Sequence, residues 1–96
     1  MIIELKKNGS TLTSRQAGKE ALAAFRPILS DISSDETISI DFSGVITFTP
    51  SWGDEFLTPL EREFGDRLIL LATDNLSVVE TLKVLESTNS IKFRRR

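Results

Sequence analysis

The sequence predicts one α/β domain with a mixed, largely parallel sheet of about four or five strands and three helices. Two observations predict this class. The chain has 96 residues, which suffices for one hydrophobic core but not for two. Short β-branched runs also alternate along it with longer segments whose apolar residues recur every three to four positions. Such alternation is typical of right-handed β–α–β crossovers, which place the carboxyl ends of all strands at one edge of the sheet.

The chain begins with a predicted strand and turn. Residues 2–5 are short, apolar and β-branched, which favours a strand. Asn8 and Gly9 form the pair most typical of a tight hairpin turn. We therefore expect residues 6–10 to lead into a brief return strand at residues 11–12.

A first helix is expected directly after this turn. Thr13 and Gln16 have the spacing of a capping box, so the helix is expected to start at Thr13. Pro27 interrupts the apolar pattern, and we expect it to kink the helix or to end it near Arg26. The apolar positions of this helix are Ala17, Ala21, Leu22, Phe25, Ile28 and Leu29.

Two extended pieces and a second helix follow. Residues 37–42 alternate between apolar and polar, and residues 45–48 form a second, shorter extended piece. Ser51 and Asp54 have capping-box spacing at the expected start of the second helix. Pro59 lies inside its pattern, so we expect one helix kinked near Leu57, or else two short helices. Its apolar positions are Trp52, Phe56, Leu60 and Phe64, and Gly65 is suited to end it.

The last third predicts a strand, a helix and an edge strand. Residues 68–72 are continuously apolar, which favours a strand covered on both faces. Residues 73–75 can cap a third helix, which we expect to end at the polar break of residues 87–90. Residues 91–94 alternate and favour an edge strand with its charges in solvent. The apolar face of the third helix comprises Leu76, Val79, Leu82 and either Val84 or Leu85.

The composition disfavours an enzyme. The chain has no His, no Cys and no Tyr, so it lacks the commonest general base, the commonest metal ligand and all thiol chemistry. It also has no glycine-rich phosphate loop. We expect neither a metal nor a cofactor.

The charge distribution narrows the expected partners. Four of the twelve basic residues lie at positions 92–96, and without them eight basic and fourteen acidic residues leave a net charge of −6. Such an acidic body disfavours a nucleic-acid face, and the basic end is expected to be a solvated tail on a core of residues 10–90. No apolar stretch approaches the length of a membrane span, and no basic segment precedes the apolar residues 2–5. We therefore expect a cytoplasmic protein.

Two alternatives to a binding module remain open. Asp41, Asp54 and Asp74 could gather at the strand ends and hold Mg²⁺ for a small carboxylate-based enzyme, although each also suits a cap or a turn. The chain could instead be a structural module that oligomerises through residues 91–94 as an edge strand.

The most informative segment spans residues 41–57. A strand end is followed by an apolar piece and then by Ser51 at the expected start of a helix. A helix N-terminus has unpaired N–H groups and partial positive charge, so it would stabilise a phosphate on that hydroxyl. The simpler interpretation is that Ser51 caps the helix.

Three short motifs, in this order and spacing, resemble the STAS domain, the fold of bacterial anti-sigma factor antagonists. The similarity spans roughly residues 10–90 and is greatest to the STAS-like family of unknown function. The motifs are Thr13-Ser14-Arg15, Asp41-Phe42-Ser43-Gly44-Val45 and Trp52-Gly53-Asp54-Glu55-Phe56. The resemblance implies a non-enzymatic signalling domain that binds a histidine-kinase-like ATPase or a sigma-factor regulator.

The resemblance also implies site residues. Ser51 matches the serine that such a kinase phosphorylates, although the antagonists read Asp-Ser-Ser-Gly where this chain reads Thr-Pro-Ser-Trp. Trp52 is either core or an exposed partner anchor, and Arg15 either pairs with Glu20 or Asp54 or is solvated. The implied contact surface is Thr49, Pro50, Trp52, Gly53, Asp54 and Glu55, supported by Asp41, Ser43 and Arg15.

Overall fold

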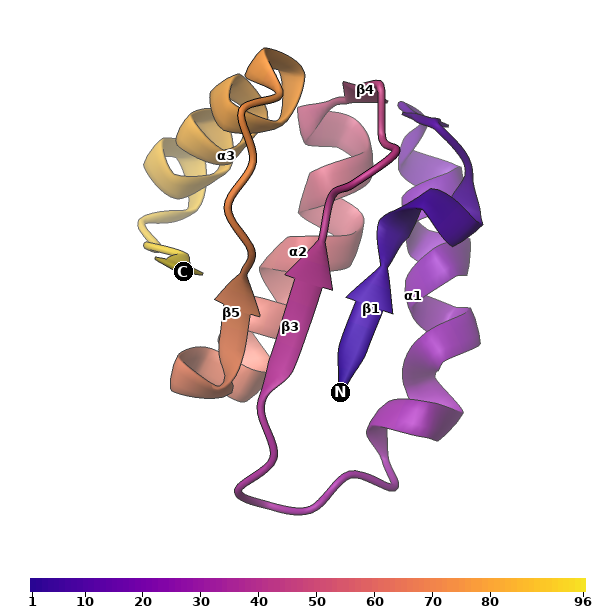
Figure 1. Ribbon diagram of the computed structural model, residues 1–96, viewed down its shortest axis with the longest axis vertical. Helices are drawn as coiled ribbons and strands as arrows, with labels where there is room; N and C mark the ends of the chain where they lie inside the picture. The colour runs from indigo at the N-terminus through magenta and orange to yellow at the C-terminus, as the bar shows by residue number, and fades with distance from the viewer.

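The computed structural model describes residues 1–96 and is a compact α/β domain with three helices. Its main sheet has four strands in the order β1-β3-β5-β6, and every neighbouring pair is parallel (Figure 1). The strands are β1 (Ile2–Glu4), β3 (Ile38–Asp41), β5 (Leu68–Leu70) and β6 (Arg94–Arg95). The helices are α1 (Arg15–Leu29), α2 (Pro50–Phe64) and α3 (Leu76–Asn89). The prediction of an α/β domain is confirmed, with a sheet that is parallel throughout.

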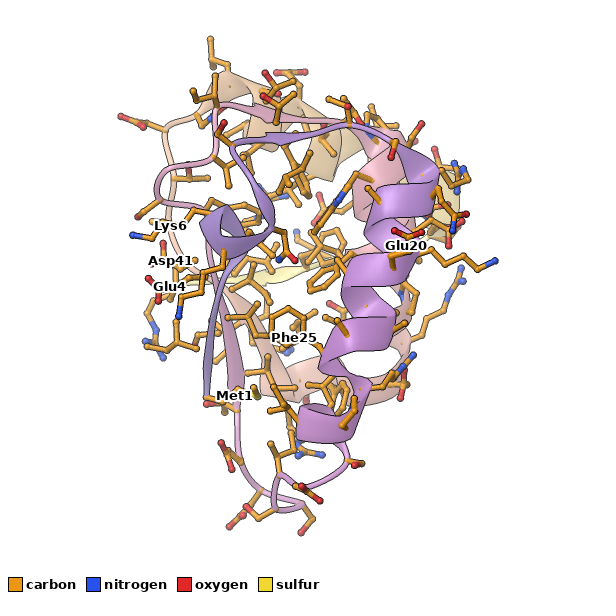
Figure 2. All side chains as sticks on the ribbon, turned by 90° about the vertical axis from the view of Figure 1, so that its right-hand side faces the viewer. Met1, Glu4, Lys6, Glu20, Phe25 and Asp41 are labelled. Carbon is orange, nitrogen blue, oxygen red and sulfur yellow. The ribbon has the colours of Figure 1, made fainter.

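All three helices lie on one face of the main sheet. Each crossover advances the strand order in the same direction, so right-handed connections place α1, α2 and α3 on the same side (Figures 1 and 2). The expectation that residues 68–72 are covered on both faces is wrong, because the strand is Leu68–Leu70 and the side chain of Ile69 lies on the uncovered face, half-buried.

The predicted N-terminal hairpin does not form. Residues Leu5–Asn8 form a 3₁₀ helix, η1, instead of a hairpin turn. Strand β2 (Thr11–Leu12) pairs in parallel with β4 (Thr47–Phe48) and makes a separate two-stranded sheet. This pairing buries Leu12 and Phe48, which a local return along β1 would not bring together.

The first two helices differ from their predictions at their starts and at their prolines. Ser14, not Thr13, caps α1, and its hydroxyl oxygen accepts the N–H of Ala17. Helix α1 continues through Pro27 to Leu29, and α2 continues through Pro59 to Phe64. Gly65 ends α2 as predicted, with a φ of 50° that favours glycine, and the 3₁₀ helix η2 (Gly65–Arg67) follows.

The C-terminal third departs further from the predictions. Asn75, the last of the three residues expected to cap α3, is its cap, but the helix runs through the predicted polar break to Asn89. Leu76, expected in the apolar face, is 75% exposed. The basic end is not a free tail, because Arg94 and Arg95 form β6 at the sheet edge. The residues that α3 buries are Val78, Thr81, Leu82 and Leu85.

The core lies between the helices and the covered face of the sheet. Its centre is a chain of aromatic rings in which Trp52 stacks on Phe56 at 4.9 Å and meets Phe48 at 5.7 Å. Trp52 is only 1% exposed, which confirms the core interpretation and excludes an exposed anchor. No helix combines the length and the apolar character that a membrane crossing requires.

Two glycines allow the elements around Trp52 to approach closely. A Cβ on Gly18 of α1 would lie 2.5 Å from the carbonyl oxygen of Trp52, so α1 rests against the backbone of α2 at this point. On another side of α2, a Cβ on Gly53 would lie 3.0 Å from the Leu85 side chain and 3.1 Å from the Phe48 ring. The start of α2 is therefore held between α1 and α3.

We expect Gly18→Ala to lower the free energy of unfolding by about 1–2 kcal/mol, because overpacking against a backbone carbonyl outweighs the gain in helix propensity. Chemical denaturation measures the change. The matched control is Ala24→Gly at an exposed position of α1, which reports propensity alone. A Gly18→Ala protein more stable than the wild type would contradict the close approach.

Candidate functional site

The site begins at the first turn of α2. Thr49 occupies the cap position, but its hydroxyl donates to the carbonyl oxygen of Thr13 at 2.9 Å and does not cap the helix. Ser51 is the second residue of α2 and is half-buried. The interpretation of Ser51 as the N-cap is therefore wrong, and so is its capping box with Asp54, whose carboxylate has other partners.

The N-terminus of α2 keeps unpaired donors. Pro50 has no N–H, and the first backbone bond back to the cap runs from the N–H of Gly53 to the oxygen of Thr49 at 3.0 Å. The N–H groups of Ser51 and Trp52 have no partner within the chain. This end of the helix carries partial positive charge beside the Ser51 side chain.

Helix α3 fixes the segment that leads into α2. The Ser77 hydroxyl accepts the N–H of Phe48 at 2.8 Å and donates to its carbonyl oxygen at 3.0 Å. The Thr81 hydroxyl donates to the same oxygen at 2.6 Å. The Asn75 amide donates to the oxygens of Val45 and Ile46. These anchors were not predicted from the sequence, although Ser77 and Thr81 have the four-residue spacing of one helix face.

Two of the motifs that resemble STAS domains, residues 13–15 and residues 52–56, meet at this site. Nη1 of Arg15 lies 2.9 Å from Oε1 of Glu55 and 3.3 Å from Oδ2 of Asp54. The predicted pairing of Arg15 with Asp54 is confirmed, whereas Glu20 accepts a hydrogen bond from Gln16 instead. The hydrogen bonds to Glu55 and Asp54 raise the pKa of Arg15 above its ordinary value.

Asp54 is held from two sides. Its Oδ1 accepts a hydrogen bond from the Asn89 amide of α3 at 3.2 Å, while its Oδ2 faces Arg15. Partial burial raises the pKa of Asp54, but the polar groups of Arg15, Thr58 and Asn89 around the carboxylate outweigh burial and lower the pKa below its ordinary 3.8. The carboxylate is therefore charged at neutral pH and links all three helices.

Some residues of the predicted contact surface are buried and the others are accessible to solvent. Trp52 and Gly53 lie inside the protein, whereas the other predicted contact residues are accessible. Two side chains absent from the prediction, Ile46 and Leu76, are 69% and 75% exposed at the same end of the molecule. We define the α2-start surface as Ile46, Thr49, Pro50, Ser51, Asp54, Glu55 and Leu76.

Asp41 and Ser43 lie at a neighbouring place, the carboxyl end of β3. Oδ1 of Asp41 accepts the backbone N–H of Ser43 at 2.9 Å, and this bond lowers the pKa of Asp41. Gly44, at a φ of 85°, completes the turn. An open hollow of about 590 Å³ lies beside it, lined by Phe42, Ser43, Gly44, Val45, Ala72, Thr73, Asp74 and Asn75.

The acidic residues do not form a metal centre. No group of three acidic side chains is arranged to hold a metal ion. The carboxylate of Asp41 accepts a hydrogen bond within a turn, and the carboxylate of Asp54 accepts hydrogen bonds from Arg15 and Asn89. This geometry argues against the alternative in which Asp41, Asp54 and Asp74 bind Mg²⁺ together.

Comparisons with protein-family models, with curated proteins and with solved structures give no match to this chain. The resemblance to STAS domains therefore depends on the three motifs and on the order of the helices and strands.

One face of α2 below the site contains polar atoms without partners. The hydroxyl of Thr58 and Oε1 of Glu61 are buried and make no hydrogen bond within the protein. Burial raises the pKa of Glu61 above its ordinary 4.5. The folded state therefore binds this proton more tightly than the unfolded state does.

We expect Arg15→Gln to raise the pKa of Asp54, because the variant removes a positive charge and a hydrogen bond while the Asn89 bond remains. NMR titration of the side-chain carboxyl carbons measures the shift. Lys19→Gln, which removes an exposed charge from the same helix, is the control. An Asp54 pKa that does not move would show that Arg15 is solvated.

We expect Glu61→Gln to raise the stability at pH 7 by about 1 kcal/mol, because it removes a partly buried charge with an unpaired oxygen. A raised native pKa makes the wild type lose stability as the pH rises from 4.5 through that pKa, so the gain should disappear below 4.5. Thermal unfolding across this range tests it, with Glu80→Gln, an exposed carboxylate on α3, as control. A pH-independent difference between Glu61→Gln and the wild type would contradict this cause.

Proposed function

We propose that this chain is a STAS-like regulatory domain of bacterial signalling that acts by binding a protein, without catalysis. Its partner is a histidine-kinase-like ATPase or a sigma-factor regulator, and phosphorylation of Ser51 switches the binding. The contact is made by the α2-start surface. The observation that carries the proposal is that the half-buried Ser51 is partly exposed in the first turn of α2, at the end of the molecule where Ile46 and Leu76 are exposed.

The contact between distant motifs supports the resemblance. Arg15 and Glu55 are separated by 40 residues, yet their side chains are joined at 2.9 Å. The fold brings the first turns of α1 and α2 close together, and the two motifs place side chains of opposite charge there. Their meeting point lies on the same helix turn that bears the switch residue.

The electrostatics at Ser51 favour a phosphate more than the sequence suggested. Asp54 and Glu55 would repel a phosphate on Ser51, but Arg15 contacts both carboxylates and offsets part of their charge. The unpaired N–H groups of Ser51 and Trp52 add donors and partial positive charge. Phosphorylation of Ser51 would replace its neutral hydroxyl by a negatively charged group at the centre of the α2-start surface.

Two exposed hydrophobic side chains of the α2-start surface can supply apolar contacts to a partner protein. Ile46 and Leu76 are the two most exposed large hydrophobic residues of the chain, and the Asn75 amide ties the two segments together through the oxygen of Ile46. Apolar side chains rimmed by charged ones are typical of protein contact sites. A phosphate beside them would make their desolvation costly and would weaken the complex.

We expect the tagged wild-type chain, used as bait in its native cell, to recover an ATPase of the histidine-kinase type or a sigma-factor regulator. Ser51→Asp should lose this protein because it introduces charge at the switch, and Ser51→Ala should retain it. Leu76→Asp should also lose it because it breaks the apolar contact. Mass spectrometry identifies the partner and tests whether Ser51 carries a phosphoryl group.

The matched control is Glu20→Arg, a charge reversal on an exposed part of α1 away from the α2-start surface. This variant should recover the same protein as the wild type. Recovery that is unaffected by Ser51→Asp and by Leu76→Asp would show that the α2-start surface is not the contact site.

A further inference from the structure

The face of the main sheet opposite the helices has no covering element. Strand alternation and register give it two rows of side chains, extended at the strand ends by the backbone bonds from Leu71 to Ile40 and from Arg96 to Leu70. The first row is Ile2, Ser39, Ile69 and Arg94, and the second row is Glu4, Asp41, Leu71 and Arg96. We call these eight residues the open face.

The open face is divided by charge. Glu4 and Asp41 are neighbours on β1 and β3, and Figure 2 shows both on the side of the sheet away from α1. The basic residues lie at the opposite edge, on and just after β6. Apolar side chains lie among them, and Ile2 is 66% exposed. The acidic side chains thus lie on β1 and β3 and the basic ones at the β6 edge, with the apolar Ile69 and Leu71 between them and Ile2 beside Glu4 on β1.

This arrangement is complementary to a second copy of itself in one orientation. A twofold axis parallel to the strands reverses the strand order of the second copy, so that β1 faces β6 and β3 faces β5. Glu4 then faces Arg96 of the other copy, and Ile2 faces the aliphatic stem of its Arg94. A twofold axis perpendicular to the strands would place β1 on β1 and β6 on β6, which sets like charges against each other.

We propose that the open face is a self-association surface, on which two copies of this chain pack sheet to sheet about a twofold axis parallel to the strands. Such contacts are isologous, because each copy supplies the same patch. This surface is distinct from the α2-start surface, so dimerisation and partner binding can be tested separately. Two face-packed sheets also shield Ile2 and the half-buried Ile69 from water.

The open face is small, so we expect the dimer to be weak. Eight residues are fewer than the roughly 20–30 per side of a standard interface, so association should be weak and concentration-dependent. Within one copy, Glu4 already contacts Lys6 and Lys7 at 3.6 and 3.3 Å, and Arg94 contacts Asp66. These pairs are exposed and weak, so they can rearrange when a second copy approaches.

Sedimentation velocity on the 96-residue chain, from micromolar to millimolar concentration, tests the proposal. The wild type should shift from monomer toward dimer, with a weaker shift at high salt. Glu4→Arg and Arg96→Glu should each weaken the dimer at least about tenfold, because each sets like charges against each other at both ends of the contact. The controls Glu20→Arg and Lys19→Glu make the same charge changes on α1 and should leave it unchanged.

Mixing the two variants gives the sharpest result. In a heterodimer of Glu4→Arg with Arg96→Glu, both facing pairs again have opposite charges, so the mixture should dimerise where each variant alone does not. The double variant with both changes should dimerise like the wild type. Circular dichroism and thermal unfolding verify that every variant folds.

A wild-type chain that stays monomeric at millimolar concentration overturns the proposal. So does a dimer that neither single reversal weakens, because its contact then lies elsewhere, such as along an edge strand. A mixture that fails to associate when the wild type does would also exclude this orientation. None of these results bears on recovery of a partner by the α2-start surface.

Discussion

The close contact between α1 and α2 is the constraint on which the rest of the structure depends. Gly18 lets the backbone of α1 approach the carbonyl oxygen of Trp52, and any larger side chain there would hold the helices apart. At that separation Trp52 can stack on Phe56, and Arg15 can reach the carboxylates of Asp54 and Glu55. The core and the candidate site are thus positioned by the same contact.

Polar side chains of α3 hydrogen-bond to the segment that leads into the site. Strand β4 has two residues, Thr47–Phe48, and such a short pair would not hold its own geometry. Ser77 and Thr81 hydrogen-bond to the backbone of Phe48, and Asn75 holds the residues just before it. These hydrogen bonds from α3 therefore hold residues 45–48, which precede Ser51, although these residues form only a two-residue strand.

The single direction of the strand order gives the protein two separate surfaces. Every helix starts at the carboxyl end of the sheet, so the first turns of α1, α2 and α3 lie near one another at one end (Figure 1). The same topology leaves the opposite face of the sheet uncovered. With no reversal in strand order, there is no crevice between strands diverging to opposite faces, the usual ligand site of doubly wound sheets.

The sequence pattern predicted those features of the fold that depend only on interactions between neighbouring residues. A cap within residues 73–75 and Gly65 as a helix end followed from the residues themselves, because capping and a positive φ are short-range requirements. The position of Ser51 was misassigned by two residues, since Thr49, Pro50 and Ser51 all suit a helix start. The local signal that distinguishes them is Pro50, because proline favours the first position of a helix and so makes Thr49 the cap residue.

By itself the sequence determined the class of the fold, the alternation of strands and helices, and the absence of histidine and cysteine chemistry. Only the tertiary structure decided that β2 pairs with β4, that both helix prolines are tolerated and that Arg15 meets Glu55. The physical reason is distance along the chain. Propensity and periodicity act over a few residues, whereas these contacts join segments about 30–40 residues apart and form only when the whole core packs.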